Sequence, residues 1–228
     1  MLFRQLFDQD TWTYTYLLAD QMTGEAVIID PVDTQLERDI KLIHELGLRL
    51  SYAFDTHVHA DHITALGALR ERLGCATGVS KHGNVACADL QLAEADQFSF
   101  GRHLLTILET PGHTDGCLSY FCDARVMTGD ALLIRGCGRT DFQQGDAGTL
   151  YDSISGKLFT LPDDTLVYPA HDYKGMTCTT IAEEKQWNPR MNLTRDDFIT
   201  FMNELDLADP KRIHEAVPAN LACGKTGN

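Results

Sequence analysis

The chain has 228 residues, of which 43% are hydrophobic and 23% are charged, a composition typical of a folded globular protein rather than a disordered one. Its 33 acidic and 19 basic residues give a formal net charge of −14, and such an acidic surface repels phosphate backbones, so we exclude nucleic acid as a partner. No apolar run reaches the length of a transmembrane helix, so we expect no membrane partner either.

The cysteines and the first residues indicate a compartment. The seven cysteines are scattered, and no close pair has the spacing of a zinc ribbon or a redox motif. Residues 1–6 do not resemble a signal peptide. We therefore expect no disulfide framework and a bacterial-type cytoplasmic location, with which a processed organellar chain is also compatible.

The first part of the chain predicts strands followed by helices. Alternation over residues 13–18 and the run 26–30, which is apolar up to Asp30, indicate two or three antiparallel strands. Thr34 and Glu37 have the spacing of a capping box, which predicts a helix that ends at Gly47. An apolar strand over 50–55 then enters the polar loop 56–62, and a helix over 63–73 ends at Gly74.

The second part repeats this pattern more loosely. Apolar runs predict strands over 104–108, 118–122, 126–127 and 165–168, and a polar, Gly-rich loop over 136–148. Helices are expected around 177–187, 194–205 and 209–216. Since no linker or repeat interrupts the chain, we interpret residues 1–228 as a single domain with a short helical C-terminal end.

Four predicted strands end in turns that carry His or Asp, and strand ends are rigid platforms for chemistry. The ligand-type residues at these ends are His57, His59, Asp61, His62, His113, Asp130 and His171. Each alone can be explained as a loop, turn or capping residue. Together they favour a metal site at one edge of a sheet, because imidazole nitrogen and carboxylate oxygen are common metal ligands.

The segment Thr56-His57-Val58-His59-Ala60-Asp61-His62, followed in order by His113, Asp130 and His171, resembles the metallo-β-lactamase superfamily over nearly the full length. This resemblance implies an α+β protein with the αββα sandwich of the metallo-β-lactamase fold, and a metal at one edge of two packed sheets.

Further segments resemble the persulfide dioxygenases within this superfamily. They are residues 135–146 (RGCGRTDFQQGD), 168–173 (YPAHDY), 188–190 (NPR) and 216–220 (AVPAN). The resemblance implies one Fe²⁺ ion per chain, held by His57, His113 and Asp130. Two histidines and a carboxylate on one face leave positions open for substrate and O₂. His59, Asp61, His62 and His171 would lie around this ion as orienting or proton-transferring groups.

The implied reaction converts glutathione persulfide, O₂ and water into sulfite and glutathione. Glutathione carries two carboxylates, so an acidic protein needs local cations to bind it. We expect Arg139 and Lys174 to bind substrate, although Arg139 can instead pair with Asp141 and Lys174 can be solvated surface. The Tyr173 hydroxyl is expected to reach substrate or the reacting oxygen, which makes it both a binding and a catalytic candidate. Family and base rates favour a homodimer.

Two other functions stay open on the residues alone. All seven ligand-type residues are present, so a dinuclear zinc hydrolase of glutathione thioesters, as in the hydroxyacylglutathione hydrolases, is chemically possible. A metal-free binding protein that retains the fold is a weaker alternative, because no ligand position is lost. Cys137 and Arg190 lie near the expected site, where Cys137 is expected to be a buried apolar residue.

Overall fold

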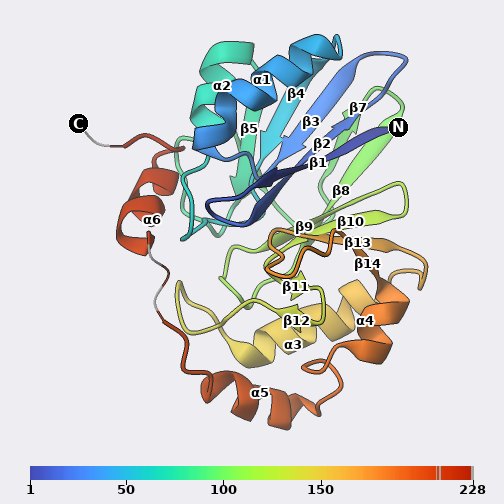
Figure 1. Cartoon of the computed structure of the whole chain (residues 1–228), viewed down its shortest axis with the longest axis vertical. Coiled ribbons are helices and arrows are strands. Elements are labelled where there is room, and N and C mark those ends of the chain that lie inside the picture. Colours follow the sequence, from blue (N-terminus) through green and yellow to red (C-terminus); the bar gives the residue numbers. More distant parts are fainter. Residues whose placement is uncertain (209, 211, 227–228) are drawn as a thin grey trace.

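The computed structural model describes residues 1–208, 210 and 212–226. Two six-stranded sheets pack face to face, and helices cover the outer face of each sheet (Figure 1). This arrangement confirms the predicted αββα sandwich. None of the helices within the described residues is long and apolar enough to cross a membrane.

The first sheet has the strand order β1-β2-β3-β4-β5-β6, antiparallel at β1–β3 and parallel from β3 to β6. Its strands are β1 (Leu2–Asp8), β2 (Thr13–Ala19), β3 (Glu25–Ile29), β4 (Arg49–Phe54), β5 (Ala76–Ser80) and β6 (Leu90–Leu92). Helices α1 (Leu36–Glu45) and α2 (Leu66–Leu73) pack on its outer face. Helix α6 (Ile213–Leu221) contacts Ile63 at the edge of this layer.

The second sheet has the order β14-β13-β10-β9-β8-β7, in which β10 and β13 are parallel and the other pairs antiparallel. Its strands are β7 (Gln97–Phe100), β8 (His103–Glu109), β9 (Leu118–Cys122), β10 (Arg125–Gly129), β13 (Leu166–Pro169) and β14 (Thr179–Thr180). Helices α3 (Ala147–Gly156) and α4 (Ile181–Trp187) cover it, and α5 (Arg195–Asn203) packs on α3. The small hairpin β11 (Leu132–Leu133) and β12 (Gly136–Cys137) follows β10.

Alternating side chains build the layers. On β2, Tyr16 and Leu18 face the second sheet, whereas Leu17 faces α1 and α2. Successive strand side chains point to opposite faces, so a strand that is apolar throughout can serve two cores. Phe54 and Tyr120 stack between the sheets at a centroid distance of 5.7 Å. This rigid double layer fixes where the strand ends lie.

Several elements differ from the sequence prediction. The N-cap of α1 is Gln35, without a side-chain cap bond, so the capping box at Thr34 and Glu37 is wrong. The predicted loop 136–148 already contains β12 and the start of α3, which Asp146 caps by accepting from the Thr149 amide at 2.7 Å. The helix expected over 209–216 begins at Ile213 and runs to Leu221, and residues 209 and 211 lie outside the described residues.

One disulfide also departs from the prediction. Cys87 and Cys223 are bonded although 136 residues separate them. The prediction considered only close sequence spacings, which carry no information on such a distant pair. The bond ties the segment after α6 to the loop that follows β5.

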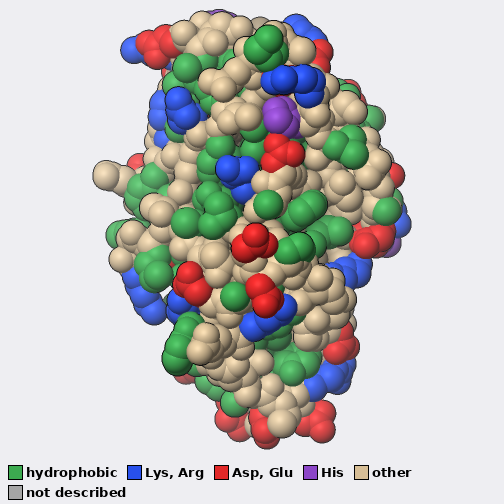
Figure 2. Space-filling model, turned by 90° about the vertical axis from the view of Figure 1, so that its right-hand side faces the viewer, with side chains coloured by type: hydrophobic (Ala, Val, Ile, Leu, Met, Phe, Trp, Pro, Cys, Tyr) green, Lys and Arg blue, Asp and Glu red, His purple; other side chains and the backbone are tan. Residues whose placement is uncertain are grey.

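The acidic charge is distributed rather than concentrated. On the face shown in Figure 2, acidic side chains alternate with lysine and arginine and with hydrophobic residues. Many acidic groups are paired, as in the double hydrogen bond of Arg102 to the buried Asp20. The surface therefore presents no single strongly charged field on this side.

Candidate metal centre

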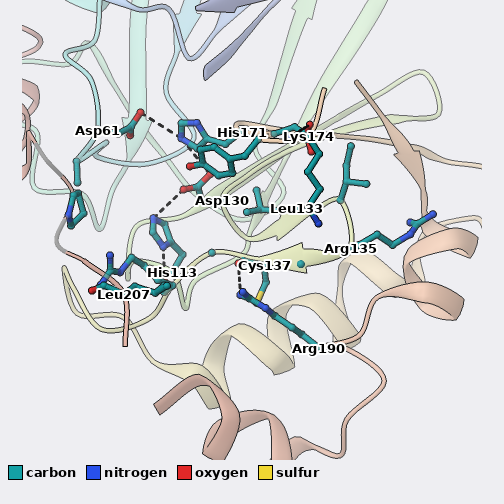
Figure 3. Close-up of a pocket in the computed structure, with 18 of the residues that line it drawn as sticks. Asp61, His113, Asp130, Leu133, Arg135, Cys137, His171, Lys174, Arg190 and Leu207 are labelled. Atoms are coloured by element: carbon teal, nitrogen blue, oxygen red, sulfur yellow. Dashed lines mark hydrogen bonds and ion pairs between the residues drawn. The ribbon is translucent and has the colours of Figure 1, made fainter. Parts of the chain in front are cut away.

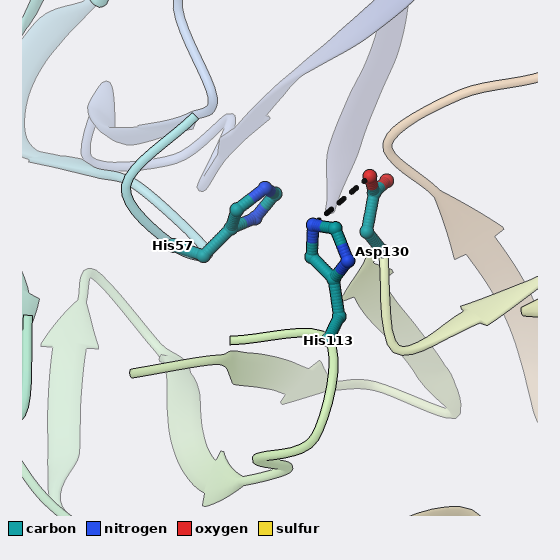
Figure 4. Close-up of side chains that lie close together, drawn as sticks. All are labelled: His57, His113 and Asp130. Carbon is teal, nitrogen blue, oxygen red and sulfur yellow. Dashed lines mark ion pairs between the residues drawn. The ribbon is translucent and has the colours of Figure 1, made fainter. Parts of the chain in front are cut away.

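The ends of four strands meet at one edge of the sandwich. His57 follows β4, His113 follows β8, Asp130 follows β10, and His171 follows β13. The structure thus confirms that the sequence-predicted turns come together. Figure 4 shows His57, His113 and Asp130 pointing toward one another from three separate loops.

These three side chains form a compact set of donors. One ligand atom from each of His57, His113 and Asp130 lies within 4.8 Å of the other two. The His113 Nε2 atom is 3.5 Å from Asp130 Oδ2, and the rings of His57 and His113 stand at 86° to each other. Such a set occupies one side of a cation and leaves the other side to the cavity.

Hydrogen bonds fix which nitrogen of each histidine is available. The His113 Nδ1–H donates to the Arg139 carbonyl at 2.6 Å, so its Nε2 carries the lone pair. The Thr56 hydroxyl donates to Asp30 and therefore accepts from His57 Nδ1 at 3.0 Å. Both Nε2 atoms are thus prepared to bind a metal before one arrives.

The electrostatics of the cluster also fit a cation. Burial lowers the pKa of His57 well below its usual value, which keeps the ring neutral. Burial raises the pKa of Asp130, but His171, His113 and His57 outweigh it and keep the group a carboxylate. Asp130 Oδ1 is buried and has no hydrogen-bond partner among the described residues. Because unpaired buried carboxylate oxygens are costly, this donor set fits a bound metal.

Asp61 and His171 lie beside His113 and Asp130 (Figure 3). The His171 Nε2 atom is 3.5 Å from Asp61 Oδ2 and 3.7 Å from Asp130 Oδ1. Burial lowers the pKa of His171, but these two carboxylates raise it to about 10. His62 Nδ1 contacts Asp61 Oδ2 at 2.8 Å. The carboxylates therefore attract positive charge throughout this part of the site.

A second group of potential ligands adjoins the first. Ligand atoms of His59, Asp61 and His62 also lie within 4.8 Å of one another. His59 uses its Nε2–H to bind Asp30 Oδ1 at 3.1 Å, while its Nδ1 has no hydrogen-bond partner in the described part of the chain. The donors alone therefore accommodate either one metal or two.

Sequence analysis missed the residue that organises the loop. Asp30 is fully buried after β3 and accepts hydrogen bonds from the Thr56 amide at 2.6 Å, the Thr56 hydroxyl at 3.0 Å and His59. It follows the apolar run 26–29 directly, the same strand-end signal that identified the ligands. Asp30 was not predicted as a site residue because no histidine lies next to it in the sequence.

Asn220 has a corresponding role from the C-terminal helix. Its Oδ1 accepts from the Thr64 amide at 2.8 Å, and its Nδ2 donates to the carbonyls of His59 and His62, both at 2.9 Å. The amide side chain is buried, and all its hydrogen-bonding directions toward this loop are used. The AVPAN segment thus holds the metal-binding loop in place.

The metal centre opens into a cavity of about 510 Å³. Its lining includes the basic side chains of Arg135, Arg139, Lys174 and Arg190. Figure 3 shows Lys174, Arg135 and Arg190 on the side of the cavity formed by the second sheet and its helices. Arg135 pairs with Glu183 and Glu184, and Arg139 pairs with Asp141. Lys174 and Arg190 form no ion pair within the described residues, so these two cations favour an anionic ligand in the cavity.

The predicted substrate residues all line this cavity, with differing contacts. Arg139 forms two hydrogen bonds of 2.6 Å with Asp141, the alternative considered from the sequence, and also donates to the carbonyls of Leu207 and Ala208. Tyr173 and Lys174 are exposed at the rim, and the Tyr173 ring stacks near His171.

The surroundings of Cys137 and Gly138 account for the residue types at these two positions after β11. Cys137 is buried, and burial raises its thiol pKa despite the nearby Arg190, as the apolar interpretation predicted. At Gly138 a Cβ atom would lie 2.3 Å from the Asp130 carbonyl and 2.9 Å from His113 Nδ1. Only glycine lets the backbone pass this close to two ligand residues.

The comparisons with known proteins agree with this geometry. Residues 13–171 match the family model of the metallo-beta-lactamase superfamily. The mitochondrial persulfide dioxygenase ETHE1 of Mus musculus is 52% identical over 227 residues, covering 98% of this chain and 89% of that protein. The crystal structure of ETHE1 from Myxococcus xanthus is 55% identical, with a TM-score of 0.96, covering 99% of this chain and all of that one.

A hydrolase is a more distant relative. The hydroxyacylglutathione hydrolase of Rhizobium meliloti is 35% identical over 173 residues, which cover 74% of this chain and 65% of that protein.

Changing His113 or Asp130 to Ala should abolish metal retention, because each substitution removes one of three ligands. Metal content after dialysis against a weak chelator, measured by atomic spectroscopy, tests this expectation. His82→Ala, at a histidine on the rim of a separate pocket, is the matched control. Full metal content in either ligand variant would contradict the ligand assignment.

Changing Asn220 to Ala should weaken metal retention without removing a ligand. It leaves the carbonyls of His59 and His62 without their donor, at a cost of about 1–3 kcal/mol for each unpaired group. We expect a lower urea midpoint and faster metal loss to chelator. Asn192→Ala, at an exposed asparagine, should change neither, and equal behaviour of the two variants would refute the role of Asn220.

Proposed function

The chain belongs to the metallo-β-lactamase superfamily, and we propose that it is a persulfide dioxygenase that converts glutathione persulfide, O₂ and water into sulfite and glutathione. The observation that carries this proposal is the relation to persulfide dioxygenases over nearly the whole length of both chains. The hydrolase relation spans a smaller part of both chains and is weaker in identity.

His57, His113 and Asp130 would hold a single Fe²⁺ ion. Two neutral imidazoles and one carboxylate, with no thiolate, are the donor set of oxygen-activating non-haem iron. When bound there, iron would supply the electron transfer that lets O₂ react with a sulfur atom. The protein contributes the fixed lone pairs on His57 and His113 and the carboxylate of Asp130.

The cavity residues bind and orient the substrate. The guanidinium of Arg139 and the ammonium of Lys174 provide positive charge for the carboxylates of glutathione, against the overall negative charge of the protein. Placing the glutathione part there directs the persulfide sulfur toward the triad. Tyr173 covers this approach with its exposed ring.

His171 and Asp61 handle protons beside the triad. The His171 Nδ1–H donates to the Trp12 carbonyl at 3.1 Å, which directs Nε2 toward the carboxylates of Asp61 and Asp130. A proton on Nε2 is therefore available to the cavity. Burial raises the pKa of Asp61, but His62 and His171 hold it well below its usual value, so this group stays a carboxylate that orients the His171 proton. His59 and His62 keep Asp61 and the loop in position.

A dinuclear zinc hydrolase of glutathione thioesters is the second candidate. The adjoining His59, Asp61 and His62 donors favour it, because two metals can activate water for attack on a thioester.

We further propose a cytoplasmic homodimer, although the Mus musculus relative is described as mitochondrial.

Protein expressed in iron-rich medium should contain about one iron per chain and consume oxygen when glutathione persulfide is added, with sulfite as product. An oxygen electrode and metal analysis measure both quantities. The His113→Ala variant is the inactive control. Thioester hydrolysis at a comparable rate without oxygen uptake would refute the dioxygenase and support the hydrolase.

Changing Arg139 to Ala should mainly raise KM for glutathione persulfide. The expected loss in kcat/KM corresponds to about 1.5–3 kcal/mol, the contribution of a hydrogen bond to a charged group. Asp141→Asn is the matched control, because it weakens the ion pair but retains the guanidinium. Unchanged KM and kcat/KM in Arg139→Ala would show that this residue has only a structural role.

A further inference from the structure

The turn that ends α6 connects the metal-binding loop to the disulfide. Asn220 donates to the carbonyls of His59 and His62, and the Cys223 amide donates to the Asn220 carbonyl at 3.1 Å. Cys223 is bonded to Cys87. One turn of the chain therefore carries both the side chain that binds the loop and the cysteine of the disulfide, so Asn220 and Cys223 move together.

Helix α6 has only a small apolar contact with the rest of the protein. The buried apolar cluster that it shares consists of Ile63, Ala216 and Ala219, and Figure 1 shows the helix at one side of the sandwich. Alanine side chains bury little apolar area, so this cluster contributes little to the docking of the helix. The position of α6 therefore depends strongly on the contacts of Asn220 and on the disulfide.

The loop that carries Cys87 is anchored without the disulfide. Its Cys87 carbonyl accepts from Arg70 of α2 at 2.7 Å, and Arg70 is also 3.3 Å from Asp89. Asp89 accepts from the Thr77 amide on β5 at 2.8 Å. These bonds hold the loop against α2 and β5 whether or not the disulfide is formed. Loss of the disulfide therefore frees the α6 end rather than the Cys87 end.

We propose that the Cys87–Cys223 disulfide is a redox-sensitive clamp on the metal centre. While the bond is formed, it holds Asn220 on the carbonyls of the metal-binding loop; its reduction by a small thiol releases the end of α6 and speeds metal loss. The inference goes beyond the proposed function, because it concerns retention of the metal whatever reaction the site performs. In the cytoplasm, where we place this protein, disulfides are usually transient and redox-sensing.

The reduction is an ordinary thiol–disulfide exchange. Cys87 is partly exposed and residues 86 and 89 are exposed, whereas Cys223 is buried, so attack occurs at Cys87 Sγ. A thiolate forms a mixed disulfide with Cys87 and displaces the Cys223 thiolate, which takes a proton. A second thiolate displaces Cys87, which is protonated in turn. Two small thiols thus supply two electrons and leave as their own disulfide, and the protein gains two thiols.

The test uses iron-loaded protein under argon, equilibrated with reduced or oxidised glutathione. The rate at which Fe²⁺ passes to the chelator ferrozine measures metal loss, and a thiol count reports the state of the disulfide. Cys87→Ser removes the bond without altering the segment 213–224. Since Cys87→Ser cannot form the bond, its response to glutathione measures any direct effect of the thiol on the metal. Cys178→Ser, at a partly exposed free cysteine, is the matched control.

Reduction should add two thiols to the wild-type chain and speed iron loss about tenfold, the lower end of the effect of losing groups that orient metal ligands. Cys87→Ser should lose iron at the fast rate in either form of glutathione, and Cys178→Ser should match the wild type. In Asn220→Ala the rate should already be fast and reduction should add little, because two changes that act through one contact are not additive.

Hydrogen exchange, measured by mass spectrometry, locates the change. Reduction should raise exchange in residues 213–224 and in the loop 56–64, while the strands of both sheets stay protected. Loss of protection throughout both sheets would overturn the clamp, because the disulfide would then stabilise the whole fold rather than the position of α6.

Three other results would overturn the proposal: wild-type protein with two added thiols that keeps iron at the oxidised rate, failure of oxidised glutathione to form the bond, or equal acceleration by reduction in Asn220→Ala. If Cys87→Ser fails to fold, Cys87→Ala replaces it. Protein that holds no iron contradicts the proposed function instead, and the same measurements on protein loaded with Zn²⁺ then test the clamp.

Discussion

The buried carboxylate of Asp30 is the contact on which the metal centre depends. It lies at the end of β3, under the loop that carries His57 and His59, and no solvent reaches it. By accepting from the Thr56 amide, the Thr56 hydroxyl and His59, it sets both the path of the loop and the tautomer of His57. Burial raises the pKa of Asp30, so its charge depends on these donors and on the histidines around it.

The relative positions of the three ligand side chains depend on both sheets, because each ligand follows a different strand. A change in the angle between the sheets would move His57, after β4, relative to His113 and Asp130, after β8 and β10. The stacked aromatic side chains of Phe54 and Tyr120 resist such a movement, since protein interiors are close-packed. The core between the sheets is therefore part of the site.

Much of the site was predictable because apolar runs that end in His or Asp report directly on strand ends. The sandwich and the seven ligand-type residues followed from that pattern and from the family resemblance. Asp30 has the same pattern, but a lone carboxylate after a strand has many ordinary explanations. Helix α3 was missed because Gly148 and Ser153 weaken the apolar periodicity that identifies helices. The Cys87–Cys223 bond and the contacts of Asn220 join residues too distant in sequence for any local pattern to reveal.

The dependence on Asn220 has a consequence for biosynthesis. The histidine-bearing loop emerges from the ribosome early, whereas the side chain that binds its carbonyls is added late. The nascent chain can form both sheets yet still lack these hydrogen bonds. The hydrogen bonds that hold the histidine-bearing loop are therefore complete only after translation has passed residue 220.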